Sequence, residues 1–277
     1  MLNKAEIKRE LASHGLPFST LLGSPEVNPK VKKNLKVNGI STRPLQLSPA
    51  SISGFNVCAS ASDACIKACL HFSGNPIYFK AKQKARINRT IAYFKHRELF
   101  LQLLKLEIDS TVRSNNKKNL STGFRLNTTS DIRWETVKLH GTMSLIDYIL
   151  SLGASVYDYT KHTNRRKAPK SYHLTHSWSG DNVDKCIEAF SNGMNVAIPF
   201  STYRSCPLPS TFKLGDTVVP VFDGDNTDYR PDDPSGVIVG LRFKYNSSNY
   251  IKQAEQLSDA VASGFCIDVE NDHRVSR

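Results

Sequence analysis

The sequence lacks any long apolar segment. No stretch approaches the ~20 apolar residues that cross a membrane, and the opening MLNKAEIKRELASHG has charges where a signal peptide has its apolar core. These absences argue against a membrane-spanning protein and against export. We therefore expect a cytoplasmic protein with no membrane partner.

Three common catalytic motifs are also missing. The chain has no G-x-S-x-G nucleophile elbow, no H-E-x-x-H zinc helix and no Walker-type phosphate loop, which argues against hydrolases, zincins and P-loop nucleotide binders. The acidic stretch at residues 223–233 resembles a calcium loop but lacks its closing Glu at the required spacing, so we interpret it as a turn region.

The composition is that of a folded, basic protein. Apolar residues make up 39% and charged residues 22% of 277 residues, which suffices for one large core. Lys and Arg number 37 against 25 Asp and Glu, a net charge of +12. This balance favours phosphate-rich partners such as DNA, RNA or a nucleotide, although the same charge keeps other proteins soluble without any such partner.

Helical and extended patterns alternate along most of the chain. Residues 1–36 predict a short helix and an arm rich in Gly, Pro and Lys, and residues 37–277 a single β/α domain. Residues 77–114 predict one long helix or two successive helices, whose first part is strongly basic and whose apolar stripe contains Ile87, Ile91, Phe94, Leu99, Leu103 and Leu106. Strands are predicted at residues 43–48, 123–127, 155–159, 172–175, 195–200, 217–222 and 236–243.

This alternation predicts an α/β fold with a mainly parallel sheet and alternating helices, either open or closed as a partial or full TIM-like β/α barrel. In such sheets the functional side chains gather in the loops beyond the carboxyl ends of the strands. The candidate cofactor-binding residues in those loops are Asn127, Ser130, Asp131, Lys161, His176, Asp223 and Asp225.

Each candidate also has a purely structural interpretation. Asp131 is equally suited to cap a helix or form an Asx turn, and Lys161 lies in a basic loop that water alone can solvate. A lone His such as His176 is more often structural. Asp223 or Asp225 is suited either to a ribose hydroxyl or to a basic side chain from a neighbouring loop.

Three thiols lie close together in residues 54–70. Cys58, Cys65 and Cys69 follow the pattern C-x6-C-x3-C, which places the last two one helical turn apart. Such a trio can ligate three irons of a 4Fe-4S cluster or three positions of a tetrahedral zinc. Buried structural cysteines or a metal-free thiol pair are the alternatives; Cys186 and Cys266 have apolar contexts typical of core thiols, and Cys206 is a candidate fourth ligand.

Several runs together carry a family resemblance: the cysteine loop, Phe124 to Asp131, Tyr157 to Lys161, Tyr172 to Ser177, and Asp223 to Asp225 followed by residues 236–240. Over about residues 30–244 the chain resembles a bacteriophage and plasmid family close to phage gene product family eighty-eight. For a phage protein, the expected location is the cytoplasm of the host cell.

A cysteine trio directly after the first strand also resembles the radical S-adenosylmethionine superfamily. The resemblance implies a 4Fe-4S cluster whose open iron binds S-adenosylmethionine, and it places Asp131 where the amino group of that cofactor is held. The spacing here departs from the usual C-x3-C-x2-C, and Ala68 and Leu70 flank Cys69 where an aromatic residue is common.

Two functional hypotheses follow. The first is a radical S-adenosylmethionine-like enzyme acting on nucleic acid or a nucleotide. The second is a binding module that grips DNA or RNA, with its cysteines holding a structural zinc or iron–sulfur site. A host protein is a third candidate partner.

Overall fold

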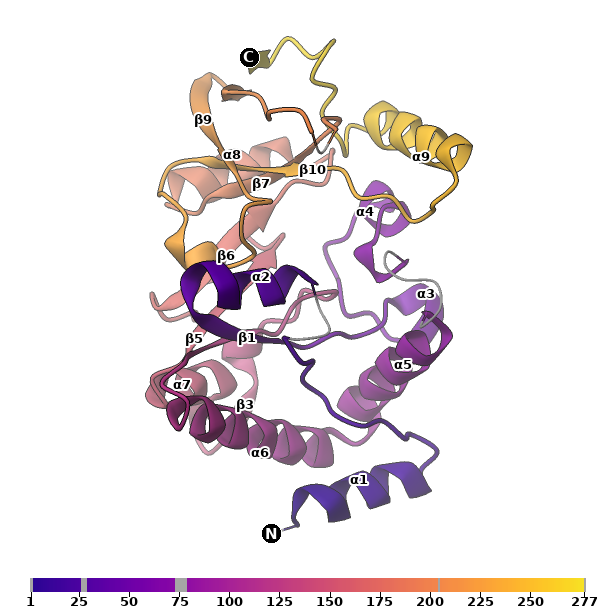
Figure 1. Cartoon of the computed structure of the whole chain (residues 1–277), viewed down its shortest axis with the longest axis vertical. Helices are drawn as coiled ribbons and strands as arrows, with labels where there is room; N and C mark the ends of the chain where they lie inside the picture. The colour runs from indigo at the N-terminus through magenta and orange to yellow at the C-terminus, as the bar shows by residue number, and fades with distance from the viewer. Residues whose placement is uncertain (1, 26–28, 73–78, 204, 277) are drawn as a thin grey trace. The chain divides into compact units, whose positions relative to one another are not determined.

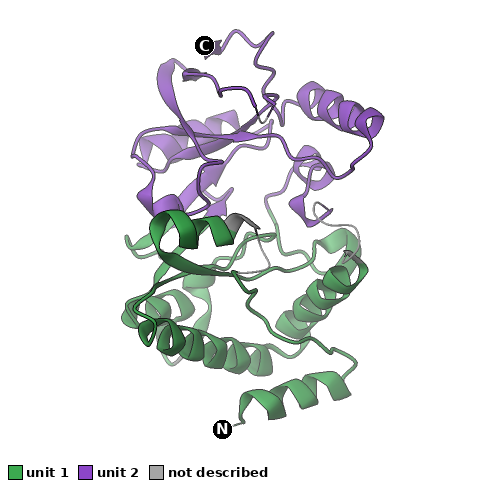
Figure 2. Cartoon of the chain, in the orientation of Figure 1, with its two compact units in different colours: residues 1–59, 75–158, 166–173 green, residues 60–74, 159–165, 174–277 purple. Residues whose placement is uncertain are grey.

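The computed structural model describes residues 2–25, 29–72, 79–203 and 205–276 (Figure 1). The chain forms two compact units (Figure 2). Unit 1 contains residues 1–59, 75–158 and 166–173, and unit 2 contains residues 60–74, 159–165 and 174–277. No helix in the described part of the chain has the length and apolar character needed to cross a membrane.

Unit 1 is built on parallel strands. β2 (Ser121–Arg125) pairs in parallel with β1 (Ile40–Pro44) on one side and β5 (Ser155–Thr160) on the other. Its helices are α1 (Lys4–Ser13), α2 (Pro29–Asn38), α3 (Ala50–Ser53), α5 (Phe79–Lys95), α6 (Arg97–Asn116) and α7 (Leu145–Ser151), with a short hairpin of β3 (Lys138–His140) and β4 (Met143–Ser144). The division between the units passes through β5 and through β6 (Tyr172–Ser177).

The region predicted to form one or two helices, residues 77–114, contains two, α5 and α6, which meet at His96. α6 buries Phe100, Leu103, Leu104 and Ile108, which recur every three to four residues as the apolar period requires. The predicted apolar stripe is less completely buried on α5, where Phe94 remains 39% exposed. The predicted start of the helix, residues 77–78, lies outside the described residues.

The N-terminal arm is more ordered than predicted. Residues 29–38, expected to be irregular, form α2, because the Pro at residue 29 begins the helix and the segment after it has no further Pro or Gly until residue 39. Before α2, the arm is fixed by a buried carboxylate. Glu107 of α6 accepts hydrogen bonds from the backbone N–H of Leu21 at 3.0 Å and of Leu22 at 2.9 Å.

Unit 2 contains the remaining strands in the order β6, β7 (Val196–Phe200), β10 (Ile238–Arg242), β9 (Thr217–Asp223), β8 (Thr211–Leu214) and β11 (Val275–Ser276). The pairs β6–β7, β7–β10 and β10–β9 are parallel, and β8 pairs antiparallel with β9 and β11. Its helices are α4 (Asp63–Lys67), α8 (Val183–Ser191) and α9 (Tyr250–Ala262).

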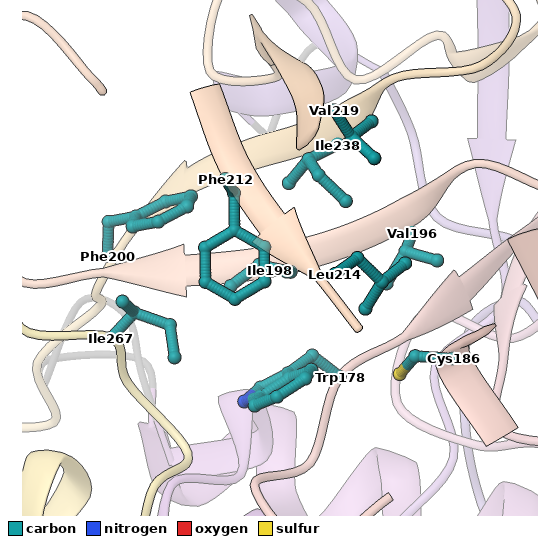
Figure 3. Close-up of a cluster of buried hydrophobic side chains, with 10 residues drawn as sticks. All are labelled: Trp178, Cys186, Val196, Ile198, Phe200, Phe212, Leu214, Val219, Ile238 and Ile267. Atoms are coloured by element: carbon teal, nitrogen blue, oxygen red, sulfur yellow. The ribbon is translucent and has the colours of Figure 1, made fainter. Parts of the chain in front are cut away.

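The core of unit 2 follows the alternation of its strands. Val196, Ile198 and Phe200 of β7 point into one apolar cluster, whereas Ala197 belongs to a cluster on the other face (Figure 3). Because both faces of β7 are buried, its sequence is a nearly continuous run of apolar residues. The residues of the larger cluster are Trp178, Cys186, Val196, Ile198, Phe200, Phe212, Leu214, Val219, Ile238 and Ile267.

The predicted α/β class with a mainly parallel sheet is confirmed. The TIM-like barrel is not confirmed: β1 ends the strand order on one side and β11 on the other, so the described strands do not close. The first strand, predicted at residues 43–48, lies at Ile40–Pro44 instead. Its bounds are set by parallel pairing with β2, which the sequence of one strand does not reveal.

We expect Glu107→Ala to lower the free energy of unfolding by about 3 kcal/mol, because the buried amides of Leu21 and Leu22 lose their acceptor. Urea denaturation gives the change, and amide hydrogen exchange of the peptide around residues 17–25 should accelerate. Glu98→Ala, at an exposed position of the same helix, should change stability by less than about 0.5 kcal/mol. Unchanged exchange in the arm would contradict the role of Glu107.

Candidate functional site

In unit 1 the loop after β2 is organised by the side chain of Asn127. Its Oδ1 accepts hydrogen bonds from Ser130 Oγ at 2.8 Å, from Ile132 N at 2.9 Å and from Trp134 Nε1 at 3.1 Å. Its Nδ2 donates to Ile132 O at 2.8 Å. Asn127 and Ser130 therefore lie together at the carboxyl end of β2, as predicted, and the contacts they make there shape the loop.

A buried carboxylate fixes the start of this loop. Asp158 on β5 is fully buried, and its Oδ1 accepts the backbone N–H of Asn127 at 2.6 Å. Its Oδ2 accepts the hydroxyl of Tyr172 at 2.7 Å. Asp158 was not among the residues singled out from the sequence, although a lone acid within the apolar run Val156 to Tyr159 is a signal that would have found it.

Cys58 lies beside the same loop in unit 1. Its backbone N–H donates to Asn56 Oδ1 at 2.9 Å, which forms an Asx turn, and its Sγ lies 4.0 Å from the carbonyl oxygen of Thr129. The backbone N–H of Asp131 donates to Val57 O at 2.8 Å. The first cysteine is thus held against the loop after β2, where the rule for parallel sheets predicts functional groups.

In unit 2, α4, the short helix that contains Cys65, lies beside the loops after β5 and β6. Ser62 caps this helix by accepting the N–H of Cys65 at 3.1 Å, and its hydroxyl donates to Ser179 O at 3.0 Å. Ser60 Oγ lies 3.5 Å from His162 Nδ1. Both contacts are at carboxyl ends of strands.

Cys65 lies on α4, whereas Cys69 follows directly after the C-cap of that helix, so only the first of the two thiols is within the helix predicted to hold both. Cys69 Sγ accepts the N–H of His71 at 3.5 Å. All six cysteines are free thiols. Among the residues that the structure describes, no three His, Cys, Asp or Glu side chains are grouped to hold a metal ion. The metal site therefore stays a prediction from the C-x6-C-x3-C spacing alone.

The core assignment of the two apolar cysteines is confirmed. Cys186 and Cys266 are buried, and burial raises the pKa of each thiol to about 12. The positive charge of Lys161 acts against this rise in the pKa of Cys186. Cys206 is exposed, as expected of a loop residue.

The acidic loop of unit 2 is paired with basic side chains. Arg242 Nη1 lies 3.0 Å from Asp223 Oδ2 and 3.4 Å from Asp225 Oδ2, and Lys244 Nζ lies 2.9 Å from Asp225 Oδ1. Of the two interpretations of these acids, the structure bears out the pairing with basic side chains. Arg242 and Lys244 were missed because they follow β10, which is adjacent to β9 only in the fold.

His176 is fully buried on β6, with its Nε2 3.4 Å from Asn182 Nδ2. The same Asn182 donates to Ser177 O at 2.9 Å and accepts from Ser179 N at 2.8 Å. This bonding supports the structural interpretation of His176 within unit 2. Cofactor binding at this residue stays a prediction.

Charge is divided unequally between the units. Unit 1 contains 25 Lys and Arg against 10 Asp and Glu, whereas unit 2 contains 12 against 15. The formal net charge is therefore +15 for unit 1 and −3 for unit 2. All of the excess positive charge of the chain belongs to unit 1.

The basic run of α5 divides into exposed and internal groups. Lys80, Lys82 and Lys84 are exposed. Arg86 is buried and donates to Gln46 Oε1 at 3.1 Å, and Arg89 Nε donates to the carbonyl of Thr20 at 2.8 Å. Burial lowers the pKa of Arg89 to about 10. Lys80 and Lys84 are thus available to solvent and ligands, whereas the arginines hold the helix in unit 1.

Comparison with known proteins identifies a family. The family model described as Gene product 88 matches residues 21–269, which confirms the resemblance to phage gene product family eighty-eight. No curated protein and no solved structure matches the chain.

We expect Asn127→Ala to lower the free energy of unfolding by about 2–3 kcal/mol, because the buried Trp134 indole and Ser130 lose their acceptor. Chemical denaturation followed by tryptophan fluorescence measures the change. Thr128→Ala is the matched control, since its hydroxyl makes only a 3.3 Å bond to Arg125 O. Equal decreases in the free energy of unfolding for the two variants would contradict the role of Asn127 in organising the loop after β2.

Proposed function

Since the chain belongs to the Gene product 88 family, a name that states no activity, we propose from its charge that it binds nucleic acid through the phosphate backbone. Unit 1 carries the binding surface in this proposal. The observation that supports it is the division of charge, +15 in unit 1 against −3 in unit 2. A charge excess that served solubility alone has no reason to be confined to one unit.

The positions of the exposed lysines favour the same function. Lys32 and Lys36 on α2, and Lys80 and Lys84 on α5, are exposed pairs spaced four residues apart on a helix. Like charges at this spacing destabilise a helix by about 0.2–0.5 kcal/mol for each pair. None of these four ammonium groups has a carboxylate partner among the described residues. Bound phosphates would offset this repulsion.

Phosphate contacts position a protein on nucleic acid without reading its sequence. Each neutralised phosphate releases condensed counterions, so the binding constant should fall linearly with salt on a log–log plot, with a slope of about −0.9 for each contact on duplex DNA. We therefore expect binding that depends strongly on salt and weakly on base sequence.

The test compares two triple variants with the same loss of charge. Replacing Lys80, Lys82 and Lys84 by Gln should weaken binding to a duplex oligonucleotide and make the salt slope shallower by about 2–3. Replacing the exposed Lys185, Lys213 and Lys252 of unit 2 by Gln should change the slope by less than about 0.5. Fluorescence anisotropy across a salt series measures both. Equal losses in the two variants, or no binding by wild type at low salt, would refute the proposal.

A second candidate is a metal-dependent function. Within unit 1, Cys58 lies at the loop after β2, and within unit 2, Cys65 and Cys69 lie beside the loops after β5 and β6, which are the usual positions for ligands of parallel sheets. In this candidate the three thiols hold a 4Fe-4S cluster or zinc. A cluster with S-adenosylmethionine would supply radical chemistry on nucleic acid or a nucleotide.

Metal and acid-labile sulfide analysis of protein purified without oxygen tests this candidate. We expect iron and sulfide in wild type and neither in a Cys58, Cys65 and Cys69 triple Ala variant, with Cys186→Ala, a buried core thiol outside the trio, as the control that keeps both. Zinc lost in the same variant would favour a structural site. No metal in wild type would leave the cysteines as ordinary thiols.

A further inference from the structure

Two aromatic rings of unit 1 stack at the surface. Phe55 lies in the loop after α3, and Phe94 lies in the last turn of α5. Their ring centroids are 4.7 Å apart with an interplanar angle of 15°, which is a parallel stack. Phe94 is nonetheless 39% exposed and Phe55 is only partly buried. An apolar ring in a core helix would ordinarily be covered, so a stacked pair left open to solvent calls for a reason.

The stack lies on the same face of α5 as exposed positive charge. At 100° per residue, Lys80, Lys84, Phe94 and Lys95 fall within about one third of the helix circumference. All three lysines are exposed, and none has a carboxylate partner among the described residues. Along the axis, Lys84 and Phe94 are separated by about 15 Å, and Lys95 directly follows Phe94 in the sequence. The face therefore combines cations with an open aromatic surface.

A network of aromatic contacts connects Phe94 to the core of unit 1. Tyr93, the neighbour of Phe94, is buried and contacts Phe94 edge to face with centroids 5.1 Å apart. Tyr93 also packs edge to face against Phe100 and Trp134, at 5.3 Å each. This network ties the end of α5 to the core of unit 1. α3 lies beside α5, which positions the loop of Phe55 (Figure 1).

We propose that the Phe55–Phe94 pair is a stacking platform for unpaired bases, so that unit 1 binds single-stranded nucleic acid more tightly than a duplex. This inference rests on the proposed function and names its substrate class. Positively charged surfaces with aromatic platforms bind single strands because every base has a π face, and each stacked base contributes about 1–3 kcal/mol. Bases in a duplex are already stacked on one another, so an intact duplex gains only the phosphate contacts.

The experiment measures affinity by fluorescence anisotropy for three oligonucleotides of equal length: a single strand, the duplex of the same sequence, and a strand of abasic residues with the same phosphates. We expect Phe94→Ala to weaken binding of the single strand about 10-fold. Its affinities for the duplex and the abasic strand should stay within about twofold of wild type. Phe94→Tyr should retain the wild-type affinity for the single strand.

Two controls separate stacking from damage to the fold. Phe94→Leu keeps an apolar side chain of similar size and should lose affinity for the base-containing strand alone. Tyr250→Ala removes an 86% exposed aromatic ring from unit 2 and should leave all three affinities unchanged. Urea denaturation confirms that each variant is folded.

The outcomes distinguish this inference from the proposed function. If Phe94→Ala and Phe94→Leu bind the single strand as tightly as wild type, the platform is refuted, while a shallower salt slope in the Lys80, Lys82 and Lys84 variant still supports phosphate binding. If Phe94→Ala weakens the abasic strand as much as the base-containing strand, the loss does not come from stacking and the inference is also overturned. If wild type binds none of the oligonucleotides at low salt, both proposals fail together.

Discussion

The organisation of unit 1 depends on the buried carboxylate of Asp158. A carboxylate removed from water is strongly unfavourable unless hydrogen-bond donors replace the lost hydration. The donors shown here are the backbone N–H of Asn127 and the hydroxyl of Tyr172. The hydrogen bond from the Asn127 N–H fixes the point where β2 ends and its loop begins. The Asn127 side chain then fixes the course of that loop through its bonds with Ser130, Ile132 and Trp134. The position of Cys58 follows in turn, because Thr129 and Asp131 of the same loop contact the segment that carries it.

Much of the fold could be predicted from the sequence, because periodicity and turn residues are local signals. They predicted β5, β7 and the helical region that forms α5 and α6. Three of the missed elements have weak local signals: α2 follows a Pro in a Lys-rich segment, and β8 and β11 are four and two residues long and exist through their antiparallel pairing. Closure of a sheet depends on pairings between distant segments, which explains why an open sheet and a barrel were equally compatible with the sequence.

The candidate site was predictable to a similar extent. The rule for parallel sheets correctly brought Asn127, Ser130 and Cys58 to one region of unit 1, since it needs only the strand positions. It could not reveal which polar groups are used internally. Arg242 is far from Asp223 in the sequence, and only the pairing of β9 with β10 makes it the counterion. The division of charge could be counted from the sequence only once the boundary of the units was known.

The difference between satisfied and unsatisfied groups bears directly on function. A ligand that used the Asn127 amide or the Asp223 carboxylate would first have to break hydrogen bonds that the protein already makes, and the lost bonds would subtract from the affinity. Lys32, Lys36, Lys80 and Lys84 carry no such cost, because they are exposed and none has a carboxylate partner among the described residues. Phosphates that replace those counterions gain from ion release, and an open aromatic ring gains from any base that covers it. The surface of unit 1 is thus better prepared for a ligand than the polar loops at the carboxyl ends of its strands.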